Sequence, residues 1–150
     1  MNFHSLAPGL QNHTYQIDYK SSSMKQIIKN GQVLEYYFEE RCHIAELLNN
    51  QDCPGVSVVR ARVEEGVTTV LHLVREADEI YYILSGQGEV EIGGETIGTM
   101  HPGDLIRIPA GTSQRITNTG SGDLVFLAIC APRFEPERYE EVNPLFQQDI

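Results

Sequence analysis

Basic residues are scarce in this chain. Its 150 residues include 11 lysines and arginines against 21 aspartates and glutamates, which gives a formal net charge of −10. Nucleic acids and anionic membranes are both bound mainly through basic surfaces. We therefore expect neither of them as a partner.

Long apolar runs and paired cysteines are also missing. No apolar stretch approaches the roughly 20 residues that a membrane-spanning helix needs. Residues 1–20 lack the cationic and then apolar pattern of a secretory signal. The cysteines Cys42, Cys53 and Cys130 show no Cys-x-x-Cys spacing, which is typical of reduced thiols in a cytoplasm. We expect a cytoplasmic protein.

The length is that of one domain. A chain of 150 residues can bury a core without disulfides or structural metals. Residues 1–23 are polar and aperiodic, so we expect an N-terminal extension before a single domain over residues 24–150. Met24 is an alternative start.

Short β-rich segments recur through the rest of the chain, with Gly-rich turns between them. The segments expected as strands are residues 56–63, 68–74, 79–84, 89–92, 105–108, 114–118 and 124–130. Residues 42–48 fit a helix or a strand by period, and the β-rich remainder favours a strand. This pattern predicts an all-β barrel or sandwich, followed by a short helix or tail over residues 138–146.

Two motifs lie in the middle of the chain. The first, over residues 66–86, carries His72 and Glu79, and the second, over residues 103–118, carries Gln114. This pair resembles the two signature motifs of the cupin superfamily, in a stretch of about half of the chain. The resemblance, closest to small single-domain bacterial cupins, implies a jelly-roll β-barrel, also called a double-stranded β-helix.

The resemblance also implies a metal site with ligands missing. In the family the first motif carries His-x-His and a Glu, and the second carries one more His. Here His72 and Glu79 are kept, whereas Val74 and Gln114 stand where the other two histidines would be. The implied ligands of a weakly held Mn²⁺, Fe²⁺, Ni²⁺ or Zn²⁺ are therefore His72, Glu79 and Gln114. Only one strong nitrogen ligand remains, so we expect poor affinity, and no organic cofactor is implied.

Three functions remain open. The leading prediction is an enzyme of isomerase or dioxygenase type that uses this metal as a Lewis acid or to organise dioxygen. The second is metal-free proton transfer, as in an isomerase, dehydratase or cyclase, with His72 as general base and Glu79 orienting it. Tyr81 or Gln114 would then polarise a carbonyl. The third is a barrel that binds a small polar metabolite without turnover.

Other candidates follow from strand parity and charge. Tyr81 shares parity with Glu79, so its hydroxyl is expected inside the barrel as a catalytic group. Gln114, Arg115 and Arg62 are the candidates for substrate binding. An inward-facing arginine would select an anionic substrate, although alternation alone does not settle which arginines face inward.

We expect a homodimer with a small molecule as its ligand. Residues 124–130 are apolar on both faces of their strand, so one face lines the barrel and the other needs a cover. Either the N-terminal strands or this apolar outer sheet would pair across the dimer interface.

Overall fold

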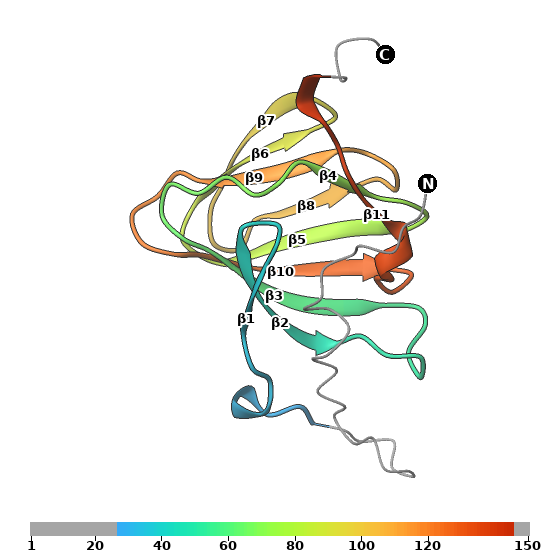
Figure 1. Ribbon diagram of the computed structural model, residues 1–150. Coiled ribbons are helices and arrows are strands. Elements are labelled where there is room, and N and C mark those ends of the chain that lie inside the picture. Colours follow the sequence, from blue (N-terminus) through green and yellow to red (C-terminus); the bar gives the residue numbers. More distant parts are fainter. Residues whose placement is uncertain (1–26, 146–150) are drawn as a thin grey trace.

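The computed structural model describes residues 27–145, which consist mainly of β-strands and their turns (Figure 1). The strands are β1 Tyr36–Phe38, β2 Cys42–Leu48, β3 Ser57–Val63, β4 His72–Val74, β5 Asp78–Ser85, β6 Gly88–Ile92, β7 Glu95–Met100, β8 Leu105–Ile108, β9 Gln114–Asn118, β10 Leu124–Ala131 and β11 Tyr139–Glu141. Short 3₁₀ turns, η1 Asn30–Gln32 and η2 Pro136–Arg138, come before β1 and β11.

The strands form two antiparallel sheets that face each other. One has six strands in the order β1-β2-β3-β10-β5-β8, and the other has five in the order β11-β4-β9-β6-β7. Because side chains alternate along each strand, one face of each sheet is apolar and packs against the other sheet. The largest fully buried apolar side chains are Ile83, Ile108, Ile116 and Leu124, which belong to one core cluster. The predicted all-β fold is confirmed.

Most of the predicted strands are present with nearly the predicted bounds, including the ambiguous β2. The exception is the segment over residues 68–74, where Thr68 forms an isolated bridge with Thr117 and β4 begins only at His72. β7 has no counterpart among the predicted strands, and β1 lies in the N-terminal part, where strands were expected without stated bounds. β7 has five exposed residues out of six, so it lacks the alternation that identifies a half-buried strand.

The C-terminal part forms η2 and β11 where a short helix or tail was expected over residues 138–146. β11 pairs with β4, so the backbone N–H and C=O groups of residues 139–141 bond to a neighbouring strand instead of forming a helix. The predicted extension over residues 1–23 lies outside the described residues, as do residues 146–150. Within residues 27–145, no helix is long and apolar enough to cross a membrane.

Two segments from outside the motifs reach β4, namely the turn between β1 and β2 and the strand β11, which lies beside β4 in Figure 1. The turn between β1 and β2 contains Arg41 in a left-handed conformation, with φ 65°. Next to it, the carbonyl oxygen of Glu40 accepts a hydrogen bond of 3.0 Å from the backbone N–H of Val70, just before β4. On the other side of β4, Glu141 of β11 pairs with His72. The hairpin and β11 therefore bring residues from outside the two motifs to His72.

Candidate functional site

His72 is buried at the start of β4, with 2% of its surface exposed. Its Nδ1 lies 2.8 Å from the carbonyl oxygen of Val70. A carbonyl oxygen only accepts hydrogen bonds, so Nδ1 carries a proton and donates it. Nε2 is therefore the ring nitrogen that can take up and release a proton.

Nε2 faces an acid that neither motif contains. Oε1 of Glu40 lies 3.5 Å from Nε2, and the Glu40 side chain is 18% exposed. Tyr139 of β11 stacks on the imidazole with the ring centroids 5.2 Å apart. The Tyr139 hydroxyl also hydrogen-bonds to Glu40. Glu40, His72 and Tyr139 thus form one cluster from three separate parts of the chain.

Burial and charge act against each other in this cluster. Burial raises the pKa of Glu40 against the effect of His72, and the charge of Glu79 adds to the rise. Burial on its own would lower the pKa of His72, but Glu40 and Glu79 outweigh it, and the pKa of His72 is raised. Burial thus opposes the ionised form of Glu40, while the negative charges of Glu40 and Glu79 favour the protonated form of His72. A histidine beside a carboxyl group can accept and release a proton.

Glu79 is buried on β5, with 6% of its surface exposed. Sγ of Cys130 donates a hydrogen bond of 3.2 Å to Oε2 of Glu79, and the hydroxyl of Tyr81 also hydrogen-bonds to this acid. Burial raises the pKa of Tyr81 and of Cys130, so both keep their protons and remain donors. Since the two nitrogens of His72 face Val70 and Glu40, Glu79 acts on the imidazole through its charge.

Gln114 lies directly opposite His72 in the pairing of β4 with β9. Opposite residues in an antiparallel pair project to the same face, so the amide and the imidazole share the interior. Gln114 is 1% exposed, and its Oε1 has no hydrogen-bond partner within the described residues. A buried acceptor without a donor costs about 1–3 kcal/mol. A ligand with a donor group would remove this cost.

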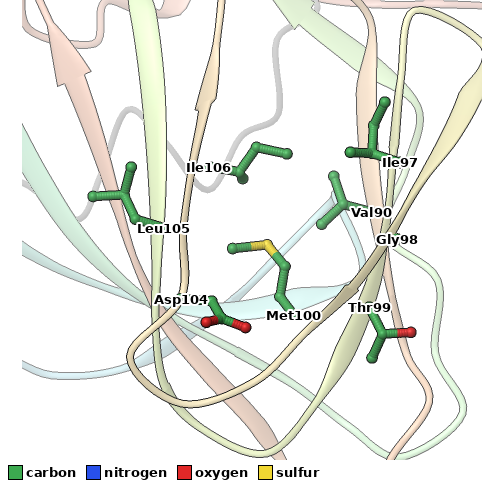
Figure 2. A pocket seen from close by; sticks show the side chains of 8 residues that line it. All are labelled: Val90, Ile97, Gly98, Thr99, Met100, Asp104, Leu105 and Ile106. Carbon is green, nitrogen blue, oxygen red and sulfur yellow. The ribbon is translucent and has the colours of Figure 1, made fainter.

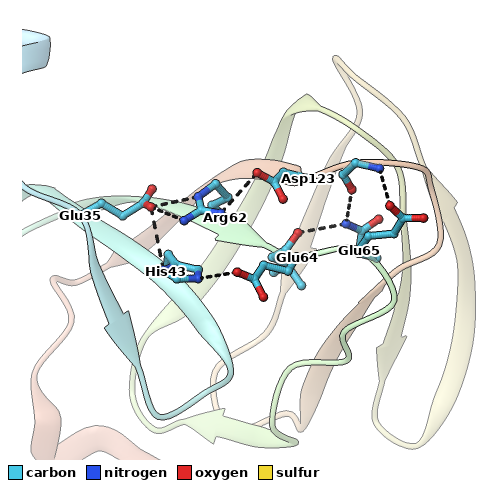
Figure 3. Close-up of polar contacts among 9 residues, drawn as sticks. Glu35, His43, Arg62, Glu64, Glu65 and Asp123 are labelled. Carbon is cyan, nitrogen blue, oxygen red and sulfur yellow. Dashed lines mark hydrogen bonds and ion pairs between the residues drawn. The ribbon is translucent and has the colours of Figure 1, made fainter.

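Arg62 is not brought to this site. Its neighbours along β3 are buried in the core, so Arg62 projects to the outer face of the six-stranded sheet. There its guanidinium pairs with Glu35 at 2.6 Å and with Asp123 at 3.3 Å (Figure 3). The same surface network includes His43, whose Nε2 lies 3.2 Å from Glu64.

Arg115 is also directed away from the site. It follows the inward-facing Gln114 in β9, and successive side chains project to opposite faces. Its Nε pairs with Glu91 at 2.7 Å. The sequence holds a signal for this placement, since Arg115 must face outward if Gln114 faces inward. Neither Arg115 nor Arg62 is placed to select an anionic substrate inside the barrel.

The donor atoms near His72 fit a divalent metal only as a weak site. His72 Nε2, Gln114 Oε1 and Glu79 offer one nitrogen and several oxygens, a set that suits Mn²⁺ better than Zn²⁺. The hydrogen bond from Nδ1 to a carbonyl is also the usual support of a metal-binding histidine. Among residues 27–145, however, no group of three or more His, Cys, Asp and Glu side chains has the geometry to hold a metal ion.

A cavity of about 290 Å³ lies elsewhere, between β6, β7 and β8 (Figure 2). Val90, Met100 and Ile106 give it an apolar lining, and Asp104 and Thr99 contribute polar atoms. None of the site residues described above belongs to it. The chemistry-bearing groups are therefore gathered at the β4 side of the barrel, and this cavity is not part of the same site.

Comparison with known proteins agrees with this architecture. The family model described as a cupin domain matches residues 59–130. An uncharacterised protein of Methanocaldococcus jannaschii is 34% identical over 119 residues, which are 77% of this chain and 94% of that protein. The oxalate-binding protein of Thermotoga maritima is 37% identical over 70 residues, 47% of this chain and 57% of that protein.

Among solved structures, the nucleoside dehydratase Pac13 matches with a TM-score of 0.67 at 21% identity, covering 79% of this chain and 92% of Pac13. Streptomyces Pac13 variants have been solved with uridine. At this identity the match shows the fold. The chain belongs to the cupin superfamily, and the predicted jelly-roll barrel is confirmed.

Glu40 and Tyr139 are the residues of the cluster that the motifs do not reveal. Glu40 lies in a turn, where side-chain alternation gives no direction, and it stands between another glutamate and an arginine. Tyr139 lies 67 positions after His72 and outside both motifs. Only the pairing of β11 with β4 brings it to His72.

Proposed function

We propose that this cupin binds a small polar metabolite beside His72 and catalyses proton transfer on it, as an isomerase or a dehydratase does. The observation that carries this proposal is the pair of His72 Nε2 and Glu40 Oε1, 3.5 Å apart and largely shielded from water. An imidazole with a carboxylate partner is a suitable acid–base group at neutral pH.

In this proposal His72 Nε2 removes a proton from the ligand, and Glu40 balances the charge of the imidazolium. In an isomerisation the imidazolium returns the proton to a neighbouring atom of the ligand. In a dehydration it gives the proton to the departing hydroxyl group, which leaves as water. Gln114 Oε1 accepts a hydrogen bond from the ligand and holds it in place, which would give this buried atom a partner.

The known relatives support a small ligand in two different ways. Pac13 is a nucleoside dehydratase and binds uridine, a hydroxyl-rich neutral molecule. The Thermotoga relative binds oxalate, a small dianion. The cluster of His72 and Glu40 fits the first kind of chemistry, because dehydration needs a group that takes and gives a proton.

Proton exchange with solvent tests the proposal. The wild type would be incubated in D₂O with nucleosides, pentoses and hexoses, and mass spectrometry and NMR would detect deuterium uptake or loss of water. We expect turnover of at least one compound, a rate about 10²–10⁴-fold lower for Glu40→Gln, and none for His72→Asn. A His72→Asn variant as active as the wild type would overturn the proposal. Binding without any exchange would favour a non-catalytic metabolite-binding barrel.

A weakly held divalent metal at His72, Glu79 and Gln114 is the second candidate, and the unpaired Oε1 of Gln114 favours it. Such an ion would supply Lewis-acid chemistry. Elemental analysis of chelator-free, tag-free protein beside His72→Ala tests this directly. Near-stoichiometric metal that is lost in His72→Ala would support the metal. Gln114→His should then bind Mn²⁺ or Ni²⁺ more tightly in calorimetry, because a second imidazole replaces a weak amide ligand.

We further propose a homodimer formed through the outer face of the six-stranded sheet. On this face Tyr82 of β5 stands opposite Leu127 of β10 and Leu105 of β8. Tyr82 is 37% exposed and Leu105 is 59% exposed. Apolar side chains that are grouped and exposed in this way are typical of surfaces that pair with another molecule.

A further inference from the structure

The polar groups gathered at the site are mostly hydrogen-bond acceptors. Gln114 Oε1 has no donor within the described residues, and Glu40 and Glu79 add two carboxyl groups. An acceptor is satisfied by an O–H or N–H group, whereas another carboxylate brings only further acceptors. Among the described residues, acceptors therefore outnumber donors at the site, where the donors are the amide N–H groups of Gln114 and the imidazole of His72.

Most of the hydrogen-bond donors around the site already have acceptors. The hydroxyl of Tyr81 and the thiol of Cys130 bond to Glu79, and the hydroxyl of Tyr139 bonds to Glu40. Nδ1 of His72 bonds to Val70. To bind an anion, these groups would have to leave their present acceptors.

Within the described part of the chain, basic side chains are also absent from the site. Within residues 27–145 no lysine or arginine is recorded in contact with Glu40, His72, Glu79 or Gln114. The arginines with acidic partners are paired away from these four residues, and they are Arg62, Arg75, Arg107, Arg115, Arg133 and Arg138. Two carboxyl groups thus stand against one imidazole, so the site does not favour added negative charge.

We infer that this site selects a neutral, hydroxyl-rich metabolite and rejects small carboxylates and phosphates unless a divalent cation accompanies them. The inference rests on the proposed function in one respect: it assumes that the ligand binds beside His72. It separates this chain from its oxalate-binding relative, with which it shares 37% identity over 70 residues. The ligand's hydroxyl groups would donate to Gln114 Oε1 and to the carboxyl groups.

Binding of matched neutral and anionic probes tests the inference. Isothermal calorimetry would compare uridine with uridine 5′-monophosphate, a panel of pentoses and hexoses with their uronic acids, and oxalate with and without Mn²⁺. We expect at least one neutral probe to bind and its anionic counterpart to bind at least tenfold more weakly. Oxalate should bind only when Mn²⁺ is present. Binding of oxalate alone, or of an anion as tightly as its neutral counterpart, would overturn the inference, as would a panel without any neutral binder.

Variants at Gln114 show whether this acceptor selects the ligand. Gln114→Met keeps the size of the side chain and removes the acceptor, so the affinity for the neutral probe should fall about tenfold. Gln51→Met, at an exposed position, is the matched control and should bind as the wild type does. If Gln114→Met does not fold, Gln114→Glu keeps an acceptor and should still bind the neutral probe while rejecting anions more strongly. Unchanged affinity in Gln114→Met, or tighter binding of anions by Gln114→Glu, would contradict the inference.

These results differ from those that decide the proposed function. Neutral binding without proton exchange would remove the proposed catalysis and leave the selectivity standing. Exchange that depends on His72 with an anionic compound would keep the catalysis and remove the selectivity.

Discussion

At the scale of single residues, the position of His72 depends on one short chain of hydrogen bonds. The Val70 N–H bonds to the carbonyl of Glu40, and the Val70 carbonyl holds Nδ1 of His72. Val70 thus fixes both the imidazole and the segment that carries its acid partner. The orientation of His72 and its charged neighbour are therefore set by the same residue.

Replacing Glu40 with glutamine should lower the pKa of His72. Two carboxylates raise this pKa against the effect of burial, and Glu40, whose Oε1 is 3.5 Å from Nε2, is the larger contributor. Without the negative charge of Glu40, the effect of burial is opposed less strongly, and the neutral imidazole is favoured. NMR titration of the ring signals, assigned with His72→Asn, would measure the change. Glu64→Gln is the control, because Glu64 contacts His43 on the surface. If the pKa of His72 fell as much in Glu64→Gln as in Glu40→Gln, the role given to Glu40 would be contradicted.

Asn118 has a structural role, and replacing it should show how much its side-chain hydrogen bonds contribute to the free energy of unfolding. Its Nδ2 donates to the carbonyls of Val63 and Gly122, and its Oδ1 accepts from the N–H of Gly120. Asn118→Ala should cost about 2–4 kcal/mol in urea unfolding. Asn118→Asp should cost at least as much at neutral pH, because a carboxylate would face two carbonyl oxygens.

The cost of Asn118→Asp should fall at acid pH. Burial beside carbonyl oxygens raises the pKa of the new acid, and protonation restores one donor. A folded-state pKa above the unfolded value means that stability is gained as pH falls. A cost that does not change with pH would show that the carbonyl contacts do not matter.

The positions of single residues could be predicted from the sequence where the residues lie in strands. His72, Glu79, Tyr81 and Gln114 lie in strands, and all four face the interior as the motifs and parity indicate. Glu40 could not be predicted, because a turn residue has no parity and its partner is set by a backbone bond to Val70.

At the scale of elements, the turn between β5 and β6 depends on a glycine for two separate reasons. Gly86 has φ +80°, and a Cβ there would lie 2.5 Å from the backbone oxygen of Asp123. Gly66 has φ +75° but has nothing within 4 Å. Gly66→Ala should therefore cost about 1–2 kcal/mol for the left-handed backbone alone.

Gly86→Ala should cost about 1–3 kcal/mol more than Gly66→Ala, because the backbone of β10 must also move. Urea unfolding of both variants beside the wild type gives the difference. Equal losses would mean that the close contact relaxes without cost.

Elements were predictable where a strand alternates or is continuously apolar. β10 reads as apolar on both faces, and its predicted bounds nearly match the observed ones. β11 is different, because Tyr139, Glu140 and Glu141 have no strand pattern and become a strand only through pairing with β4. The predicted homodimer, in contrast, stays a prediction.

At the scale of the whole molecule, the charge of the chain and the charge of the site have the same sign. The chain has a formal net charge of −10, and the site holds two carboxyl groups, the buried Glu79 and the 18% exposed Glu40, beside one imidazole. An anionic ligand would meet this charge on approach as well as at the site. At high salt the association rates of neutral and anionic ligands should therefore become more alike. The difference between their affinities should persist, because buried charges are screened less.

The outer face of the six-stranded sheet should hold two copies of the chain together. Tyr82 stands between Leu127 and Leu105, so a charge at this position would lie in the middle of the face. Burial of an unpaired carboxylate is costly, and Tyr82→Glu should therefore convert a dimer into a monomer. Ile97→Glu, on β7 of the other sheet and 54% exposed, is the matched control and should stay dimeric. Sedimentation velocity would measure both, and a monomeric wild type or a dimeric Tyr82→Glu would show that this face is not the interface.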